Sequence, residues 1–165
     1  MAASMAAQVL ESLRGAGLSI VFAESLTGGM LASELAAVPG ASDVFLGGVV
    51  AYNNAVKQNI LGVSGKSLEV AGAVSEDVAL QLAQGAQKHF AAAGGLTISQ
   101  VVSVATTGVA GPSASEGKPV GTVFIAALVA ERSIVREYHF DGDRQHIREA
   151  SCRAAFALVE ELLKP

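Results

Sequence analysis

The first third of the chain alternates between helical and extended hydrophobic patterns. Residues 6–13 carry apolar side chains at helical spacing. Residues 18–23 are a short β-rich run of the kind that is buried on both faces of a sheet. Helical spacing returns over residues 30–38. The pattern predicts a helix, an interior strand and a second helix, with a sharp turn at residues 24–29.

The middle of the chain predicts one more strand and two more helices. Residues 44–52 form a strand candidate, and Asn53 is placed to cap a helix that ends near Leu61. A longer helix is expected to begin at Ser75, where acidic residues favour its first turn, and to stop at Gly94. The alternation of strands and helices is typical of an α/β protein.

The last part of the chain predicts a hairpin and a closing helix. Residues 100–106 and 120–130 are strand candidates, and 134–140 follows the second after only three residues. That short connection requires an antiparallel pair, so the sheet is expected to be mixed. A helix over 143–163 closes the chain, and no repeat or linker divides it. We therefore expect one domain over residues 1–165.

Composition and charge limit the kinds of partner that the protein is expected to bind. The net charge is -4 and no basic run is present, so nucleic acid is not expected as a partner. The mean hydropathy is +0.46. Even so, the purely apolar stretch 123–130 is far shorter than a membrane span, and we expect no membrane association. The N-terminal segment lacks the positive start of a signal sequence, and the single cysteine, Cys152, cannot form an internal disulfide. We expect a cytoplasmic protein.

The turn at residues 24–29 is the first candidate for chemistry. Ser25 follows a strand and precedes Gly28-Gly29 at a helix start, a geometry that exposes a hydroxyl beside free backbone N–H groups. A serine nucleophile needs a base, and the histidines lie in stretches without other catalytic features. Lys57, one helical turn after Asn53, is therefore the candidate base. Pattern alone favours the alternative, in which Ser25 or Thr27 caps a helix and the lysine is solvated.

Two further segments are candidates for anion binding. The loop 106–112 follows a strand, and its glycines would let backbone N–H groups approach a phosphate, although it is equally an ordinary glycine loop. Arg144 and Arg148 lie four residues apart and would present two guanidinium groups to one anion, unless they pair with Asp141 or Glu149. No cluster has metal-ligand spacing, so we expect neither a metal nor another cofactor.

Seven sequence blocks together resemble one known family. They are AESLTGG at 23–29, VPGAS at 38–42, GGVVAYNN at 47–54, GAVS at 72–75, TGVAGP at 107–112, KPVGTV at 118–123 and DGDR at 141–144. In this order, the blocks resemble the CinA C-terminal domain family of competence/damage-inducible proteins and nicotinamide-nucleotide amidases, here in a stand-alone form. The resemblance implies a three-layer α/β/α sandwich with a mixed, mostly parallel central sheet. It also implies hydrolysis of nicotinamide mononucleotide to nicotinate mononucleotide and ammonia.

The resemblance also assigns residues. Ser25 is the implied nucleophile, Lys57 its base, and Tyr52 a neighbour that orients one of them. The implied substrate-binding residues are Thr27, Gly28, Gly29, Asn53, Thr107, Gly108, Gly111 and Arg144. We further expect the backbone at 27–29 to stabilise an oxyanion.

Two departures from the family pattern stand out. Leu26 replaces a common cysteine, and the segment 113–117 has fewer glycines than usual, which puts a phosphate contact there in doubt.

Two other functions remain open from the sequence. One is a non-catalytic nucleotide-binding or interaction module of the same fold. The other is a nucleotide pyrophosphate hydrolase, which would require a divalent metal and an acidic cluster. A small α/β protein of this apolar content is also expected to form a homo-oligomer.

Overall fold

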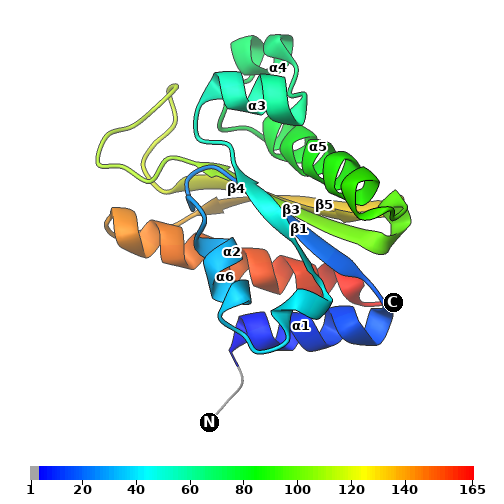
Figure 1. Ribbon diagram of the computed structural model, residues 1–165. Coiled ribbons are helices and arrows are strands. Elements are labelled where there is room, and N and C mark those ends of the chain that lie inside the picture. Colours follow the sequence, from blue (N-terminus) through cyan, green and yellow to red (C-terminus); the bar gives the residue numbers. More distant parts are fainter. Residues whose placement is uncertain (1–3) are drawn as a thin grey trace.

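A mixed five-stranded sheet with the order β2-β1-β3-β4-β5 forms the middle of the molecule (Figure 1). The computed structural model describes residues 4–165; residues 1–3, the start of the segment expected not to act as a signal sequence, lie outside the described residues. The strands are β1 (Ser19–Glu24), β2 (Phe45–Val50), β3 (Val101–Gly108), β4 (Thr122–Val129) and β5 (Arg132–His139). β1 pairs parallel with β2 and β3, whereas β4 pairs antiparallel with β3 and β5. Four strands therefore run in one direction and β4 in the other.

Helices cover both faces of the sheet. Figure 1 shows α1 (Met5–Ala16), α2 (Met30–Ala36) and α6 (Arg144–Leu163) below the sheet. It shows α3 (Asn54–Leu61), α4 (Gly65–Val70) and α5 (Glu76–Gly94) above it. Two short 3-10 helices, η1 (Ala41–Asp43) and η2 (Ile98–Gln100), each precede a strand. The expected three-layer α/β/α sandwich with a mixed sheet is confirmed.

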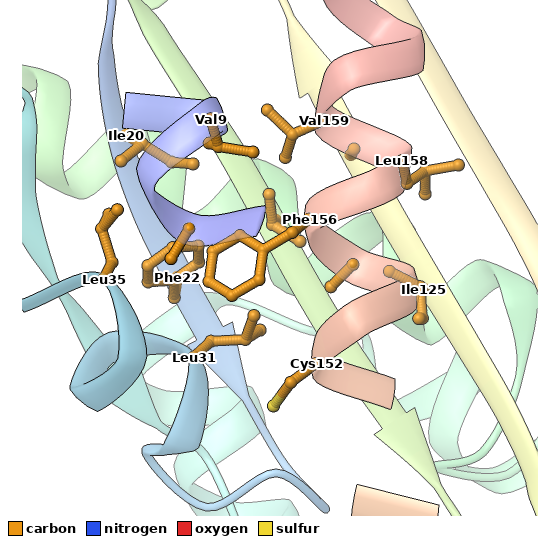
Figure 2. Packing of buried hydrophobic residues seen from close by; sticks show 14 of the residues in the cluster. Val9, Ile20, Phe22, Leu31, Leu35, Ile125, Cys152, Phe156, Leu158 and Val159 are labelled. Atoms are coloured by element: carbon orange, nitrogen blue, oxygen red, sulfur yellow. The ribbon is translucent and has the colours of Figure 1, made fainter. Parts of the chain in front are cut away.

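The two faces of the sheet are packed differently. Below the sheet, the ring of Phe22 packs against the rings of Phe45 and Phe156, with centroids 5.5 and 6.3 Å away. Figure 2 shows Phe22 and Phe156 side by side. Above it, small side chains of α5, such as Ala79, Ala83 and Ala86, are fully buried against the strands. Most of the aromatic residues pack on the lower face, whereas Phe90 and Phe124 pack on the upper one, where small residues let α5 lie close to the sheet.

The predicted elements match the observed ones except in one region. The helix α4 was not predicted because none of its residues is buried, so it leaves no hydrophobic periodicity in the sequence. Ser64 caps this helix by accepting a hydrogen bond from the Ser67 N–H. Among residues 4–165, no helix is both long and apolar enough to span a membrane.

Candidate active site

A cavity of about 310 Å³ opens at the edge of the sheet where β1, β2 and β3 end. The segments that follow these strands and the first residue of α6 line it. Sequence-predicted residues in its wall are Ser25, Tyr52, Lys57, Thr107, Gly108, Gly111 and Arg144. The carboxyl ends of parallel strands are where open α/β sheets usually bind ligands. The fold therefore brings seven of the eleven expected site residues to one place.

Ser25 lies at the cavity wall directly after β1. Its N–H donates to the Thr106 carbonyl over 3.0 Å, so the turn begins by continuing the pairing of β1 with β3. The side chain is 9% exposed. The next residue, Leu26, also lines the cavity, and its N–H has no acceptor within residues 4–165. The turn thus offers a hydroxyl and one unused backbone donor to the cavity.

Glu24 is a buried residue beside the Ser25 turn whose importance for the turn the sequence did not reveal. Its carboxylate is 1% exposed and accepts hydrogen bonds from the N–H groups of Gly29, Leu31 and Ala32 over 3.0, 3.1 and 2.9 Å. A buried negative charge at the start of a helix is stabilised by these unpaired donors. The signal in the sequence was an acidic residue at the end of an otherwise apolar strand.

Two of the three N–H groups expected to stabilise an oxyanion already have acceptors within the turn region. Gly29 donates to Glu24, and the Gly28 N–H donates to the Ser25 carbonyl over 3.1 Å. The Thr27 hydroxyl shares a 2.8 Å hydrogen bond with Thr106 and is fully buried. Thr27, Gly28 and Gly29 therefore hold the turn in shape instead of lining the cavity. Within the turn, Leu26 lines the cavity and its N–H has no acceptor within residues 4–165.

Arg148 also holds the Ser25 turn. Its Nε donates to the Leu26 carbonyl over 2.9 Å and its Nη2 to the Thr27 carbonyl over 2.8 Å. The sequence left open whether Arg148 joins Arg144 at one anion or pairs with Asp141 or Glu149; in the structure, the backbone of the turn occupies its Nε and Nη2. Glu24 binds the N–H groups of the turn region and Arg148 its carbonyls, so opposite charges fix opposite ends of the peptide dipoles.

Lys57 projects into the cavity from α3. It is 2% exposed, and its Nζ donates to the Tyr52 carbonyl over 3.1 Å. Burial lowers the pKa of Lys57, and the negative charge of Glu116 opposes this shift to a smaller extent. No hydrogen bond joins Lys57 to Ser25 among the described residues, although both line the same cavity. Asn53 lies outside the wall, because its side chain caps α3 by accepting from the Ala55 N–H over 2.8 Å.

Arg144 joins two sides of the cavity. Its guanidinium donates to the Tyr52 hydroxyl over 2.8 Å and to the Gly111 carbonyl over 2.6 Å. The side chains of Arg144 and Tyr52 are both exposed. The Thr107 hydroxyl is already engaged, because it donates a hydrogen bond to the Ala73 carbonyl over 2.7 Å. Arg144 is thus a positive group at the cavity that is exposed to solvent.

Glu116 is the second residue that the sequence analysis missed. It lines the cavity from the loop after Pro112, and its Oε2 accepts from the Val74 N–H over 3.2 Å. It is the sole acidic residue in the segment 108–117, which was the available signal. The loop therefore brings a negative charge to the cavity.

Other reactive side chains lie away from the cavity. Cys152 is fully buried in α6, where burial raises the pKa of its thiol. Within residues 4–165, no group of three or more His, Cys, Asp or Glu side chains is arranged to hold a metal ion.

The fold and the cavity define an α/β domain with a strand-end pocket that contains a serine and a buried lysine. A family model of the CinA C-terminal domain matches residues 2–163, and the chain belongs to this family. It is 45% identical over 152 residues to a CinA-like protein of Fervidobacterium nodosum, covering 92% of this chain and 35% of the relative. It is 46% identical over 147 residues to a CinA-like protein of Thermotoga neapolitana, covering 88% and 34%. The chain thus spans about a third of the length of these relatives.

Solved structures of the same superfamily share the fold. A competence/damage inducible protein from Agrobacterium tumefaciens matches with a TM-score of 0.87 and 34% identity, over 97% of this chain and 94% of that one. A CinA superfamily protein from Escherichia coli matches with a TM-score of 0.88 and 34% identity, over 96% and 88%. The similarity therefore covers all three layers.

Proposed function

We propose that this domain hydrolyses the carboxamide of nicotinamide mononucleotide, with Ser25 as the nucleophile and Lys57 as the proton carrier. The observation that carries this proposal is the position of Lys57. Its amine is buried, has a lowered pKa and opens into the same cavity as the Ser25 hydroxyl. A lysine that is neutral near pH 7 is what a serine nucleophile without a histidine requires.

In the first half-reaction, neutral Lys57 takes the hydroxyl proton of Ser25. The Ser25 Oγ bonds to the carboxamide carbon, and the carbonyl oxygen becomes an oxyanion. The intermediate then breaks its C–N bond, and the protonated lysine returns the proton so that ammonia leaves. An acyl-enzyme on Ser25 remains.

In the second half-reaction, water attacks the acyl carbon while Lys57 accepts its proton. The ester bond to Ser25 breaks, the serine regains a proton, and nicotinate mononucleotide is released. The Leu26 N–H is the proposed oxyanion donor, since Leu26 lines the cavity and its N–H has no acceptor among the described residues. One such donor typically contributes about 3 kcal/mol to transition-state stabilisation.

Size and charge support a mononucleotide as substrate. The cavity of about 310 Å³ lies at the lower end of small-molecule sites. Arg144 is positioned to exchange its contacts with Gly111 and Tyr52 for a phosphate. We propose that the phosphate end of the substrate lies at Arg144 and the carboxamide between Ser25 and Lys57.

The test is ammonia release from nicotinamide mononucleotide by the parent protein and four variants. Ser25→Ala and Lys57→Met should each lower kcat by at least about a thousandfold, because each removes a group that acts in both half-reactions. Ser133→Ala and Lys66→Met change exposed residues outside the cavity and should retain the parent rate. Full activity in either Ser25→Ala or Lys57→Met would overturn the mechanism.

A second candidate is nucleotide binding without catalysis. It is favoured by the absence of a hydrogen bond between Ser25 and Lys57 among the described residues, since an assembled pair would normally be joined. Binding of nicotinamide mononucleotide by the parent protein, with no ammonia released over hours, would support this candidate against hydrolysis.

A further inference from the structure

We propose that Glu116 is a specificity-determining residue, which makes the cavity select a ligand ring that carries a positive charge over the same ring without it. The inference rests on the proposed function, because it concerns how the nicotinamide end of the substrate is recognised. It assigns a role to the loop after Pro112, for which the sequence analysis found none.

The position of the Glu116 carboxylate at the cavity wall is fixed by contacts with Val74 and Gly72. Its Oε2 accepts a hydrogen bond from the Val74 N–H, and Val74 itself lines the cavity. Gly72 makes room for it: a Cβ at this position would lie 2.5 Å from Oε2, and Gly72 has a φ of +79°. The glycine thus allows the loop carrying Glu116 to rest against the segment before α5.

No ion pair within residues 4–165 involves Glu116, so its charge is not neutralised when Lys57 is neutral. The ionisable side chains in the wall are Tyr52, Lys57, Glu116 and Arg144. Arg144 binds neutral oxygens of Tyr52 and Gly111, and no ion pair joins it to Glu116 in the described part of the chain. When Lys57 is neutral, Glu116 is the negative end of the cavity and Arg144 the positive end.

Nicotinamide mononucleotide has the complementary charges, a cationic pyridinium ring and an anionic phosphate. With the phosphate at Arg144, the ring lies toward Lys57 and Glu116. The carboxylate then attracts the ring cation, and the attraction is modest because Glu116 is exposed to solvent. A neutral ring of the same shape gains nothing from this charge.

The same carboxylate affects the base. Before the ligand binds, Glu116 favours the protonated form of Lys57, which is the wrong form for a base. A pyridinium ring bound beside both groups offsets the negative charge. The cationic substrate would therefore neutralise the charge of Glu116 and favour the neutral form of Lys57, which is the form that acts as a base.

The experiment measures binding in a Ser25→Ala background, so that no turnover occurs. Calorimetry compares oxidised nicotinamide mononucleotide with its reduced dihydronicotinamide form, whose ring is neutral. We expect the oxidised form to bind more tightly, and the added change Glu116→Gln to reduce this preference by about three- to tenfold. A glutamine keeps an oxygen for the Val74 N–H, so only the charge is lost. Glu131→Gln, in the turn after β4, is the matched control and should leave the preference unchanged.

The outcomes separate the two proposals. An unchanged preference in the Glu116→Gln protein overturns the role of Glu116 while the proposed function stands. Failure of the Ser25→Ala protein to bind the oxidised nucleotide overturns the proposed function, and the inference with it. A preference that falls when Glu116→Gln is added, and that also falls in the Ser25→Ala protein at high salt, supports the inference.

Discussion

Lys57 is the residue at which stability and the proposed chemistry conflict. Its amine is buried with a single hydrogen bond to the Tyr52 carbonyl, and no carboxylate forms an ion pair with it among the described residues. Such burial disfavours the charged form and lowers the pKa of the side chain. A proton carrier requires this shift, whereas the folded state is destabilised by it.

This conflict predicts a stabilising substitution. Because the folded pKa of Lys57 is lowered, the unfolded chain holds an extra proton between the folded pKa and about 10.4, so stability falls as pH drops through this window. Lys57→Met removes the effect. We expect its free energy of unfolding to exceed that of the parent at pH 7 and the gap to shrink toward pH 10.5, in urea titrations at both pH values.

The exposed Lys66→Met variant is the control for this measurement. It should change the free energy of unfolding by less than about 0.5 kcal/mol at either pH. A Lys57→Met protein that is less stable than the parent at pH 7 would contradict the argument, because it would show that the hydrogen bond to Tyr52 outweighs the burial of the amine.

At the residue scale, the family motifs identified residues of the cavity, whereas the contacts that each side chain makes could not be predicted from the sequence. Ser25, Lys57 and Arg144 do line one cavity, but residue patterns alone favoured a helix cap and a solvated lysine for the first two. Glu24 and Glu116 were missed because a buried carboxylate and an exposed one look alike in a sequence. Their partners are backbone N–H groups, which carry no residue-specific signal.

At the scale of elements, the Ser25 turn depends on Glu24. The carboxylate satisfies three N–H groups at the start of α2, which would otherwise be unpaired. Glu24→Gln keeps the shape but replaces one acceptor oxygen with a donor that opposes either the Ala32 N–H or the N–H groups of Gly29 and Leu31. We expect a loss of about 2 kcal/mol in the free energy of unfolding, measured in urea.

A control for Glu24→Gln is available in the same helix. Glu34 is an exposed residue of α2 that accepts no hydrogen bond within residues 4–165. Burial raises the pKa of Glu34, and the nearby carboxylates of Glu149 and Glu24 raise it further, so Glu34→Gln should not lower the free energy of unfolding. Equal effects of the two substitutions would show that the three hydrogen bonds of Glu24 contribute little.

The contact of α3 with α5 gives a second prediction about elements. Gly85 lies inside α5, and a Cβ there would overlap the Leu61 carbonyl oxygen at the end of α3. Gly85→Ala should destabilise the protein by about 1–3 kcal/mol despite the better helix propensity of alanine. Gly15→Ala in α1 meets no atom within 4 Å and should stabilise it by about 0.5–1 kcal/mol. Thermal unfolding of both variants should show a lower Tm for Gly85→Ala and a higher Tm for Gly15→Ala. Tm changes of the same sign would contradict the prediction.

At the scale of the whole molecule, strand order builds the site. Ser25, Lys57 and Gly111 follow β1, β2 and β3, and Arg144 begins the helix after β5, which runs in the same direction as those three strands. Hydrophobic periodicity predicted most of these elements but could not predict their order in the sheet, because strand pairing is decided by contacts between distant residues. Only the family resemblance could therefore predict that these residues lie together in one site. The expected homo-oligomer stays a prediction.

A site assembled from four distant segments should couple ligand binding to global stability. Ligand at about 100 times its Kd adds about 2.7 kcal/mol, which for a chain of this size raises the Tm by about 5–10 °C. We expect nicotinamide mononucleotide to produce such a shift in the Ser25→Ala protein, measured by calorimetry. At the same concentration, nicotinamide riboside should produce a smaller shift because it lacks the phosphate that Arg144 is proposed to bind. Adding Arg144→Met should bring the two ligands to similar shifts, whereas an undiminished difference would place the phosphate elsewhere.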